Sequence, residues 1–506
     1  MSSTGSHPIP DWAEKVAGWL GSGPHVVVTG ISPSGDIHVG NLREVLVGEA
    51  VANALKARGE EVRFVFHADT IDPLRKIAPG VPESFERYLG HSLSRIPDPE
   101  GCHASYAEHF LGPFKEALRR MEVDVEVLRS HELYEGGFYA EVTREALERT
   151  GELRGILQEV SGRKMPEHWS PYLPRTADGR LGGRILEHLP EEKKVIFVDE
   201  DGWEDAADYS KGEGKLGWRV ELAARWKALS ATFEPFGKDH TSRGGSTDTA
   251  DRIAREVFRY PVPGRYEYEW IQIRGKGAMS SSKGIVLLPG ELLEVMPPDA
   301  LRRMVLGRDP ARALDLDLGA GFPRFMDEYK TDVEDKPVPF THLVTVAQTV
   351  DGNLGEEGPI LELAAEMLRR SGYVETVGDR EKLARDLSYA HNWAERWAPE
   401  SYRFRVRKEL PPEAEDLDAD QRGYLAAVAD KIEPGLDRDA VQDLLHQKAG
   451  EFGLKPKAAF GAVYTVLLGK RSGPKAGPFV AGLDADFVRE RFLSVSGDAT
   501  VGGAEG

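Results

Sequence analysis

The chain has 506 residues, a net charge of −19 and a single cysteine, Cys102. Its length allows several domains, and one cysteine excludes an internal disulfide framework and any multi-cysteine metal site. No apolar run is long enough to span a bilayer, and the N-terminus lacks the basic and apolar segments of a signal peptide. We therefore expect a cytoplasmic protein that has no membrane partner. The negative charge argues against nucleic-acid binding, although a large acidic protein can still carry a local basic surface.

The first part of the chain alternates predicted strands and helices. Residues 25–29 form a short β-branched run that indicates a buried strand. A turn rich in Gly, Ser and Pro follows over residues 30–35, and a helical pattern covers residues 41–58. A second apolar run over residues 62–66 indicates another strand. This order predicts a βαβ unit and hence a parallel sheet.

The alternation continues with a helix, a strand and a further helical stretch, at residues 105–121, 123–128 and 139–161. Between residues 162 and 217 the pattern loosens into Pro, Gly and charged residues, with one expected strand at residues 194–198. A strand over residues 232–236 and a helix over residues 248–258 then resume the first pattern. We expect one α/β sheet that is interrupted by a small inserted domain.

Beyond residue 297 the segments are amphipathic and rich in Ala, Leu, Glu and Arg, and no strand is evident. The predicted fold class is therefore α/β, with a Rossmann-type parallel sheet, a small insertion domain and an all-α C-terminal region. The expected parts are the first half of the sheet domain, the insertion, the second half, a linker and a helical domain, at residues 1–145, 146–217, 218–296, 297–355 and 356–500.

The segment Pro33-Ser34-Gly35-Asp36-Ile37-His38-Val39-Gly40-Asn41 lies between the first strand and its helix. Glycine lets the backbone approach a ligand, and a helix N-terminus offers free N–H groups and a positive dipole. His38 and Asn41 add donors three residues apart, on one face of the helix. The pattern is typical of a phosphate site, and a plain βα turn with a capping role is the alternative.

A second motif, Ala278-Met279-Ser280-Ser281-Ser282-Lys283-Gly284, is a loop of small residues that ends in a cation. Such a loop can close over a triphosphate, with its hydroxyls and Lys283 meeting the charge that develops during transfer. A flexible surface loop is the alternative, and it is the better interpretation of a Ser-rich stretch taken alone.

In this order, the two motifs resemble the HIGH and KMSKS signatures of class I aminoacyl-tRNA synthetases, and the surrounding sequence resembles class I lysyl-tRNA synthetase. Further matching segments are Asp72 to Lys76, Ser105 to Phe110, Phe236 to His240, Tyr268 to Ile271 and Asp327 to Tyr329. The resemblance covers residues 21–330 well and is weak across the C-terminal helices. It implies a lysine–tRNA ligase, which activates lysine with ATP to lysyl-adenylate and transfers it to the 3′ end of tRNA(Lys).

The resemblance also implies site residues. ATP, with its Mg²⁺, would be bound by the two motifs, namely by Pro33, Ser34, Gly35, His38, Gly40, Asn41, Met279, Ser280, Ser281, Ser282 and Lys283, of which His38, Asn41 and Lys283 are the expected catalytic residues. The amino acid would be bound by Gly30, Ser32, Asp69, Trp218, Asp239, His240 and Tyr268. Either Asp239 or Asp69 could take the lysine ammonium, and packing is the alternative role of the two aromatic residues.

The sequence departs from the family pattern in three places. Ala278 stands where the family usually has Lys, the insertion lacks the cysteine pairs of a zinc knuckle, and residues beside the amino-acid pocket differ. We therefore expect no structural zinc and no metal ligands. Two alternatives remain open: a paralogue that makes an aminoacyl-adenylate or aminoacyl-tRNA for another pathway, and a non-catalytic tRNA-binding relative. The C-terminal helices would bind the anticodon, residues 297–355 would contact the tRNA stem, and the expected oligomeric state is a monomer.

Overall fold

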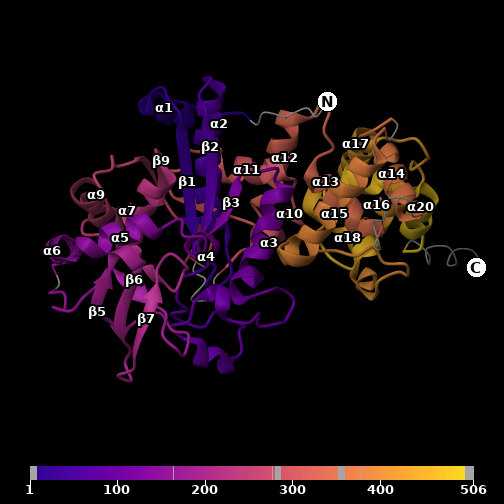
Figure 1. Cartoon of the computed structure of the whole chain (residues 1–506). Helices are drawn as coiled ribbons and strands as arrows, with labels where there is room; N and C mark the ends of the chain where they lie inside the picture. Colours follow the sequence, from indigo (N-terminus) through magenta and orange to yellow (C-terminus); the bar gives the residue numbers. More distant parts are fainter. Residues whose placement is uncertain are drawn as a thin grey trace, which may run out of the picture. The chain divides into compact units, whose positions relative to one another are not determined.

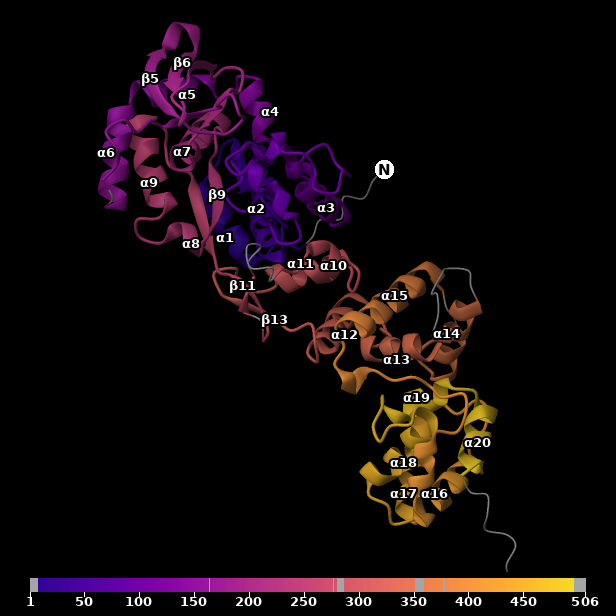
Figure 2. The ribbon, with the colours of Figure 1, turned by 90° about the horizontal axis from the view of Figure 1, so that it is seen from below.

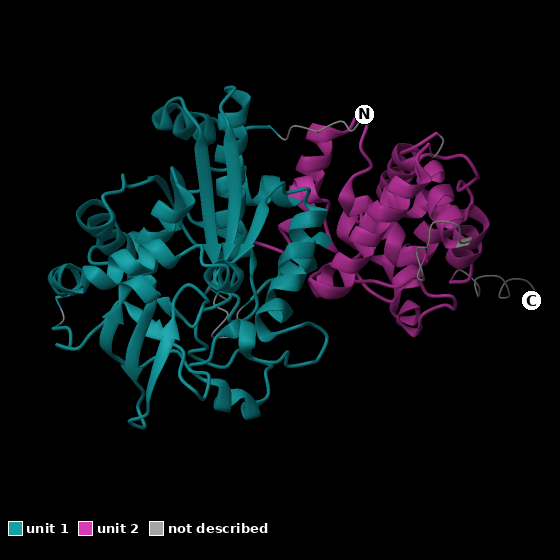
Figure 3. Ribbon diagram, in the orientation of Figure 1, with its two compact units in different colours: residues 1–293, 301–316 teal, residues 294–300, 317–506 magenta. Residues whose placement is uncertain are grey.

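The computed structural model describes residues 8–162, 164–275, 277–279, 286–350, 359–375 and 378–495 (Figure 1). The chain forms two compact units, coloured separately in Figure 3. Unit 1 comprises Met1–Leu293 and Leu301–Leu316, and unit 2 comprises Glu294–Ala300 and Asp317–Gly506. Among the described residues, no helix has both the length and the apolar character that a bilayer span requires. The finer division into five parts stays a prediction.

Unit 1 is built around a five-stranded sheet with the order β10-β9-β1-β2-β3. Every pairing in it is parallel. The strands are β1 (His25–Ile31), β2 (Val62–Ala68), β3 (Glu126–Arg129), β9 (Phe233–Gly237) and β10 (Gly264–Tyr268). The chain runs outward from β1 in one direction to β3 and later in the other direction to β10, so the strand order reverses at β1. This confirms the predicted Rossmann-type α/β class, in which ligands bind outside the carboxyl ends of the strands at the reversal.

The central strands are buried, which explains why their sequences are short apolar runs. Val27 and Val28 of β1 and Phe66 of β2 are fully buried, as expected for parallel strands covered on both faces. The helix between them, α2 (Val39–Ala57), is buried along almost all its length. The other helices of the first half are α1 (Asp11–Leu20), α3 (Tyr106–Arg120), α4 (Ser130–Glu135), α5 (Ala140–Glu148) and α6 (Thr150–Ser161).

The insertion contains more strand than the single run predicted at residues 194–198. Its strands are β4 (Tyr172–Pro174), β5 (Arg184–Leu189), β6 (Lys194–Val198), β7 (Glu204–Asp208) and β8 (Gly214–Leu216). The β5-β6-β7 sheet is antiparallel and lies beside α5 in Figures 1 and 2. Val195 and Phe197 are buried in the same core as Val142 and Ala146 of α5. Most residues of β5 and β7 are exposed or half-buried, which is why they lack an apolar pattern.

The second half of unit 1 adds short elements after the insertion. They are α7 (Trp218–Leu229), α8 (Lys238–Thr241), α9 (Ser246–Arg252), β11 (Ile271–Ile273), β12 (Gly277–Ala278) and α10 (Pro289–Leu293). One strand lies where none was expected, beyond residue 297: β13 (Leu314–Leu316), which pairs in parallel with β11. Three residues with mixed burial give too short a pattern to recognise.

Unit 2 is helical in its described residues. Its helices are α12 (Phe322–Val333), α13 (Phe340–Val350), α14 (Pro359–Arg370), α15 (Arg380–Arg396), α16 (Ala419–Ala429), α17 (Arg438–Glu451), α18 (Pro456–Leu468), α19 (Ala476–Gly482) and α20 (Ala485–Leu493); α11 (Pro298–Leu306) spans the boundary between the units. Leu425, Leu445, Val463, Phe479 and Phe492 are fully buried in one apolar core, as the helical periodicity predicted.

Candidate active site

The carboxyl ends of the sheet strands open onto a cavity of about 820 Å³ within unit 1. Gly30 comes from the end of β1, Asp69 directly follows β2, Asp239 follows β9, and Tyr268 ends β10. All four line the cavity. Because parallel strands end at the same edge of a sheet, residues more than two hundred positions apart in the chain share this one space.

The cavity gathers all but one of the described residues of both predicted substrate sites. The residues that line it from those two sets are Gly30, Ser32, Ser34, Gly35, His38, Gly40, Asn41, Asp69, Trp218, Asp239, His240, Tyr268 and Met279. Pro33 is buried and does not line it. The predicted residues Ser280, Ser281, Ser282 and Lys283 lie outside the described residues. The roles of all these residues stay predictions.

The N-terminus of α2 forms one end of the cavity. His38 is the N-cap residue of α2, and its backbone N–H donates to Oδ1 of Asn41, the third residue of the helix, at 3.1 Å, as in a capping box. Burial lowers the pKa of His38 to about 4, and its buried Nδ1 has no hydrogen-bond partner among the residues that the structure describes. A Cβ atom on Gly40 would lie 2.8 Å from His38 Cε1. Glycine at this position therefore gives the neutral imidazole the room that it occupies.

Glu44 is a cavity residue to which the sequence analysis gave no role. Its carboxyl group accepts hydrogen bonds from the Gly30 backbone N–H at 2.8 Å and from Tyr268 Oη at 2.7 Å. Burial raises the pKa of Glu44 to about 8, which outweighs the lowering by these two hydrogen bonds. The sequence did contain a signal that Glu44 belongs to the site, because Glu44 lies three residues after Asn41 and therefore on the same face of α2.

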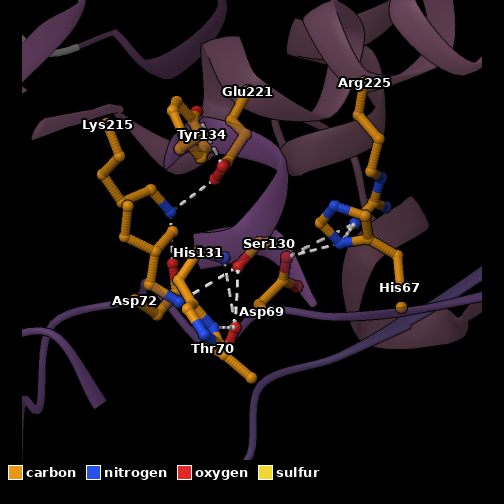
Figure 4. Close-up of polar contacts among 12 residues, drawn as sticks. His67, Asp69, Thr70, Asp72, Ser130, His131, Tyr134, Lys215, Glu221 and Arg225 are labelled. Carbon is orange, nitrogen blue, oxygen red and sulfur yellow. Dashed lines mark hydrogen bonds and ion pairs between the residues drawn. The ribbon is translucent and has the colours of Figure 1, made fainter. Parts of the chain in front are cut away.

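Asp69 is already paired with the protein's own groups. His67 Nδ1 lies 2.9 Å and Arg225 Nη1 3.7 Å from Asp69 Oδ1. Burial alone would raise the pKa of this carboxyl group. The charges of His67 and Arg225 lower it by more, so the resulting pKa is about 2. Arg225 also pairs with Glu234 at 2.5 Å. Asp69 is thus held as a carboxylate inside a closed network (Figure 4).

Asp239 is the more open of the two carboxylates that the sequence analysis could not separate. Its side chain is 54% exposed, and its Oδ2 lies 3.5 Å from His240 Nε2. Trp218 and His240 face each other edge to face with their ring centroids 6.4 Å apart. The two rings lie beside an acidic residue that remains accessible to water, and their role in binding an amino acid stays a prediction.

A separate cluster lies outside this cavity, at the start of α3. The possible ligand atoms of Asp98, Cys102, His103 and His109 all lie within 4.8 Å of one another, and Cys102 Sγ is 2.9 Å from His103 Nδ1. One thiol, two imidazoles and one carboxylate form a donor set that suits a tetrahedral Zn²⁺ site. The zinc pattern expected from the sequence was a cysteine pair in the insertion, and such a pattern does not reveal a set in which Cys102 stands alone. The expectation of no structural zinc stays a prediction.

Comparisons with known proteins place the chain in a family. The model of the family described as tRNA synthetases class I (K) matches residues 11–348. The lysine–tRNA ligase of Archaeoglobus fulgidus is 39% identical, over 95% of this chain and 99% of that protein. That of Thermoplasma acidophilum is 36% identical, over 96% and 99%. A solved glutamate tRNA ligase of Elizabethkingia meningosepticum is similar over 93% of this chain and 99% of its own, with 12% identity and a TM-score of 0.46.

The family model covers more than half of the chain, and both relatives are similar to it along nearly their whole length. The resemblance found in the two motifs is therefore confirmed at the level of the family. The chain belongs to the class I lysyl-tRNA synthetases.

Proposed function

We propose that the cavity of unit 1 binds ATP and lysine side by side, joins them as lysyl-adenylate, and passes the lysyl group to the 3′ end of tRNA(Lys). The observation that supports this proposal is that the two ends of one cavity differ chemically, one being suited to phosphate and the other to a cation. One end is a helix N-terminus with His38, Gly40 and Asn41, and the other contains the half-buried side chain of Glu44.

The ATP end offers donors in place of a catalytic base. Backbone N–H groups at the start of α2 and its positive dipole suit phosphate oxygens. His38, with its low pKa, is neutral at pH 7 and can donate one hydrogen bond without accepting a proton. Arg75 and Lys76 line the same cavity and supply the positive charge that a triphosphate requires. Mg²⁺ would enter on the phosphates as part of the substrate MgATP.

At the amino-acid end, Glu44 is the best acceptor for the lysine ammonium. Asp69 is paired with Arg225 and His67, so a second cation there would meet the existing positive charge. The side chain of Asp239 is about half exposed, where water weakens an ion pair. Glu44 has no cation within ion-pair distance in the described structure, and its raised pKa reflects that unpaired burial. The aromatic ring of Trp218 can cover the methylenes of the substrate.

The reaction follows from holding the two substrates together. One lysine carboxylate oxygen attacks the α-phosphorus of ATP, and the bond from that phosphorus to the bridging oxygen breaks, which releases pyrophosphate. A terminal hydroxyl of tRNA then attacks the carbonyl carbon of the adenylate and releases AMP. Positioning and electrostatic stabilisation are sufficient for such transfers, so no protein nucleophile is required.

Pyrophosphate exchange into ATP tests the proposal. The exchange is measured with each of the twenty amino acids, first without and then with tRNA. We expect exchange with lysine above all others. Exchange with a different amino acid would assign the chain to the divergent-paralogue alternative, and no exchange under either condition would leave only the non-catalytic tRNA-binding alternative. Metal analysis of the purified protein decides separately whether the Asp98 cluster holds zinc.

A further inference from the structure

Lys215 is a buried lysine at the junction of the insertion and the sheet. It lies on β8, its side chain is 2% exposed, and its ammonium lies between Asp72 and Glu221, 2.5 Å from Glu221 Oε2 (Figure 4). Tyr134 Oη donates to the other oxygen of Glu221 at 2.9 Å. Burial alone would lower the pKa of Lys215. The charges of the two carboxylates raise it by more, so the net shift is upward and the ammonium stays charged.

One partner of Lys215 begins a loop that reaches the cavity. Asp72 lines the cavity, and so do the five residues that follow it except the buried Leu74. Among the described lining residues, Arg75 and Lys76 are the two whose side chains carry a permanent positive charge. The Asp72 carbonyl accepts from the Leu93 backbone N–H at 2.9 Å, and Leu74 exchanges backbone hydrogen bonds with His91 and Gly90. These bonds hold the backbone at the base of the loop, and the ammonium of Lys215 holds the Asp72 side chain.

The other partner belongs to the opposite wall. Glu221 lies in the first turn of α7, the helix that also carries Trp218 and Arg225. Trp218 lines the cavity, and Arg225 holds Asp69. Lys215 therefore links a loop that carries cations to a helix that carries the aromatic wall, although 143 residues separate it from Asp72.

We propose that Lys215 is a positioning residue of the active site, which fixes and neutralises Asp72 so that Arg75 and Lys76 are presented to the phosphates of ATP. The proposal rests on the function proposed above and extends it, because it gives the inserted part of the chain a role in nucleotide binding. Without the ammonium, Asp72 would place an uncompensated negative charge beside those two cations and compete with the phosphates for them.

The test compares Lys215→Met with a matched variant in unit 2. Lys330 is also a buried lysine between two carboxylates, Glu334 and Asp386, and Lys330→Met removes an equivalent ion pair that does not involve cavity residues. Binding of α,β-methylene-ATP and of lysine is measured by calorimetry at a temperature at which circular dichroism shows each full-length variant to be folded. We expect Lys215→Met to weaken binding of the ATP analogue about tenfold or more, and Lys330→Met to leave it within about twofold.

A double variant separates positioning from general loss of stability. Since Lys215 acts through Asp72, the effects of Lys215→Met and Asp72→Asn on the dissociation constant of the ATP analogue should not multiply when combined. Effects that multiply, or equal weakening by Lys330→Met, would overturn the proposal. Failure of the proposed function is distinguishable: the wild-type protein would then bind the analogue but show no lysine-dependent exchange, whereas failure of this inference leaves exchange intact and Lys215→Met binding unchanged.

Discussion

A lysine ammonium is buried between two carboxylates in each unit, and the two cases differ in what they connect. Lys330 on α12 pairs with Glu334, the residue that directly follows this helix, at 2.8 Å, and with Asp386 on α15, at 2.7 Å. Lys215 joins a loop and a helix that both line the cavity. A buried ion pair contributes little net stability compared with an apolar packing of the same volume. The role of each buried ion pair is therefore better inferred from the elements that it connects than from a contribution to stability.

The rest of each unit extends this contrast. Around the cavity, unit 1 buries Asp69, Arg225 and Glu234, and it holds Glu44 with a raised pKa. The main core of unit 2 is a set of Leu, Val, Ala and Phe side chains. Charges are costly to bury unless they are paired, so their concentration at one place indicates a site that must recognise charged substrates. Variants in each unit can test whether the site residues of unit 1 determine substrate binding while the apolar core of unit 2 determines stability.

The largest effect is expected for Glu44→Gln. The amide keeps the shape: its one oxygen can still accept from the Gly30 N–H, and its NH2 group can donate to Tyr268 Oη, but it cannot take a negative charge. Removing one partner of a buried charged pair costs about 4 kcal/mol, so kcat/KM for lysine in pyrophosphate exchange should fall about 10³-fold. Tyr268→Phe is the control, because it removes one hydrogen bond and keeps the carboxyl group, and its loss should be at least tenfold smaller. A Glu44→Gln enzyme that keeps its lysine kcat/KM would exclude Glu44 as the ammonium acceptor.

The next effect is expected for Gly40→Ala at the other end of the cavity. The new methyl group would meet the His38 ring at 2.8 Å and force it to move. A displacement of about 1 Å can reduce turnover about 10²-fold, so kcat for exchange should fall by about that factor. Gly151→Ala is the control, since its Cβ atom would have no neighbour within 4 Å. Gly59→Ala would be unsuitable, because the positive φ of Gly59 would strain an alanine. Equal kcat for both variants would show that the His38 position is unimportant.

A smaller effect is expected from pH. Lysine binding should require the ionised form of Glu44, whose pKa in the unliganded protein is about 8, whereas the substrate ammonium stays protonated throughout this range. The dissociation constant of lysine should therefore decrease as pH rises, by about tenfold between pH 6.5 and 8, and then level off. Calorimetry in buffers of different ionisation enthalpy should also detect release of a proton below pH 8. A flat profile would contradict the assignment.

The smallest effect on the site is expected for Leu425→Ala in unit 2. Leu425 is fully buried in the helical core, and its truncation should lower the free energy of unfolding by about 2–5 kcal/mol. The dissociation constants of lysine and of the ATP analogue should not change at temperatures where the variant is folded. Weaker binding by this variant, measured by the same calorimetry, would show that stability and site geometry are coupled across the chain.

Much of the fold could be predicted because local patterns and long-range structure agree. The apolar runs became β1 and β2, and the motif between them became the start of α2, as expected for a βαβ unit. The strands β5, β7 and β13 could not be predicted, because short or largely exposed strands have no apolar periodicity. The predicted helix at residues 139–161 is two helices, α5 and α6, which meet at Arg149.

The site was predictable where a motif marks it and was missed where partners meet only in three dimensions. The glycines and His38 are recognisable from their spacing. Glu44 and Asp69 are both single acidic residues in the sequence. Only the three-dimensional structure shows that Asp69 pairs with Arg225, whereas Glu44 accepts from Tyr268 and has no ion-pair partner among the described residues. Lys215 could not be recognised at all, because its partner Asp72 lies 143 residues earlier.

The position of β1 between β2 and β9 has a consequence for synthesis. The Val26 backbone N–H donates to Thr232 Oγ1, 206 residues later, so the sheet cannot close when its first strands leave the ribosome. At roughly 5–20 residues per second, translation of that interval takes on the order of 10 to 40 s. During this time the apolar edge of β1 has no native neighbour. The pairing of β1 with β9 is therefore delayed, and the cavity is among the last parts of unit 1 to form.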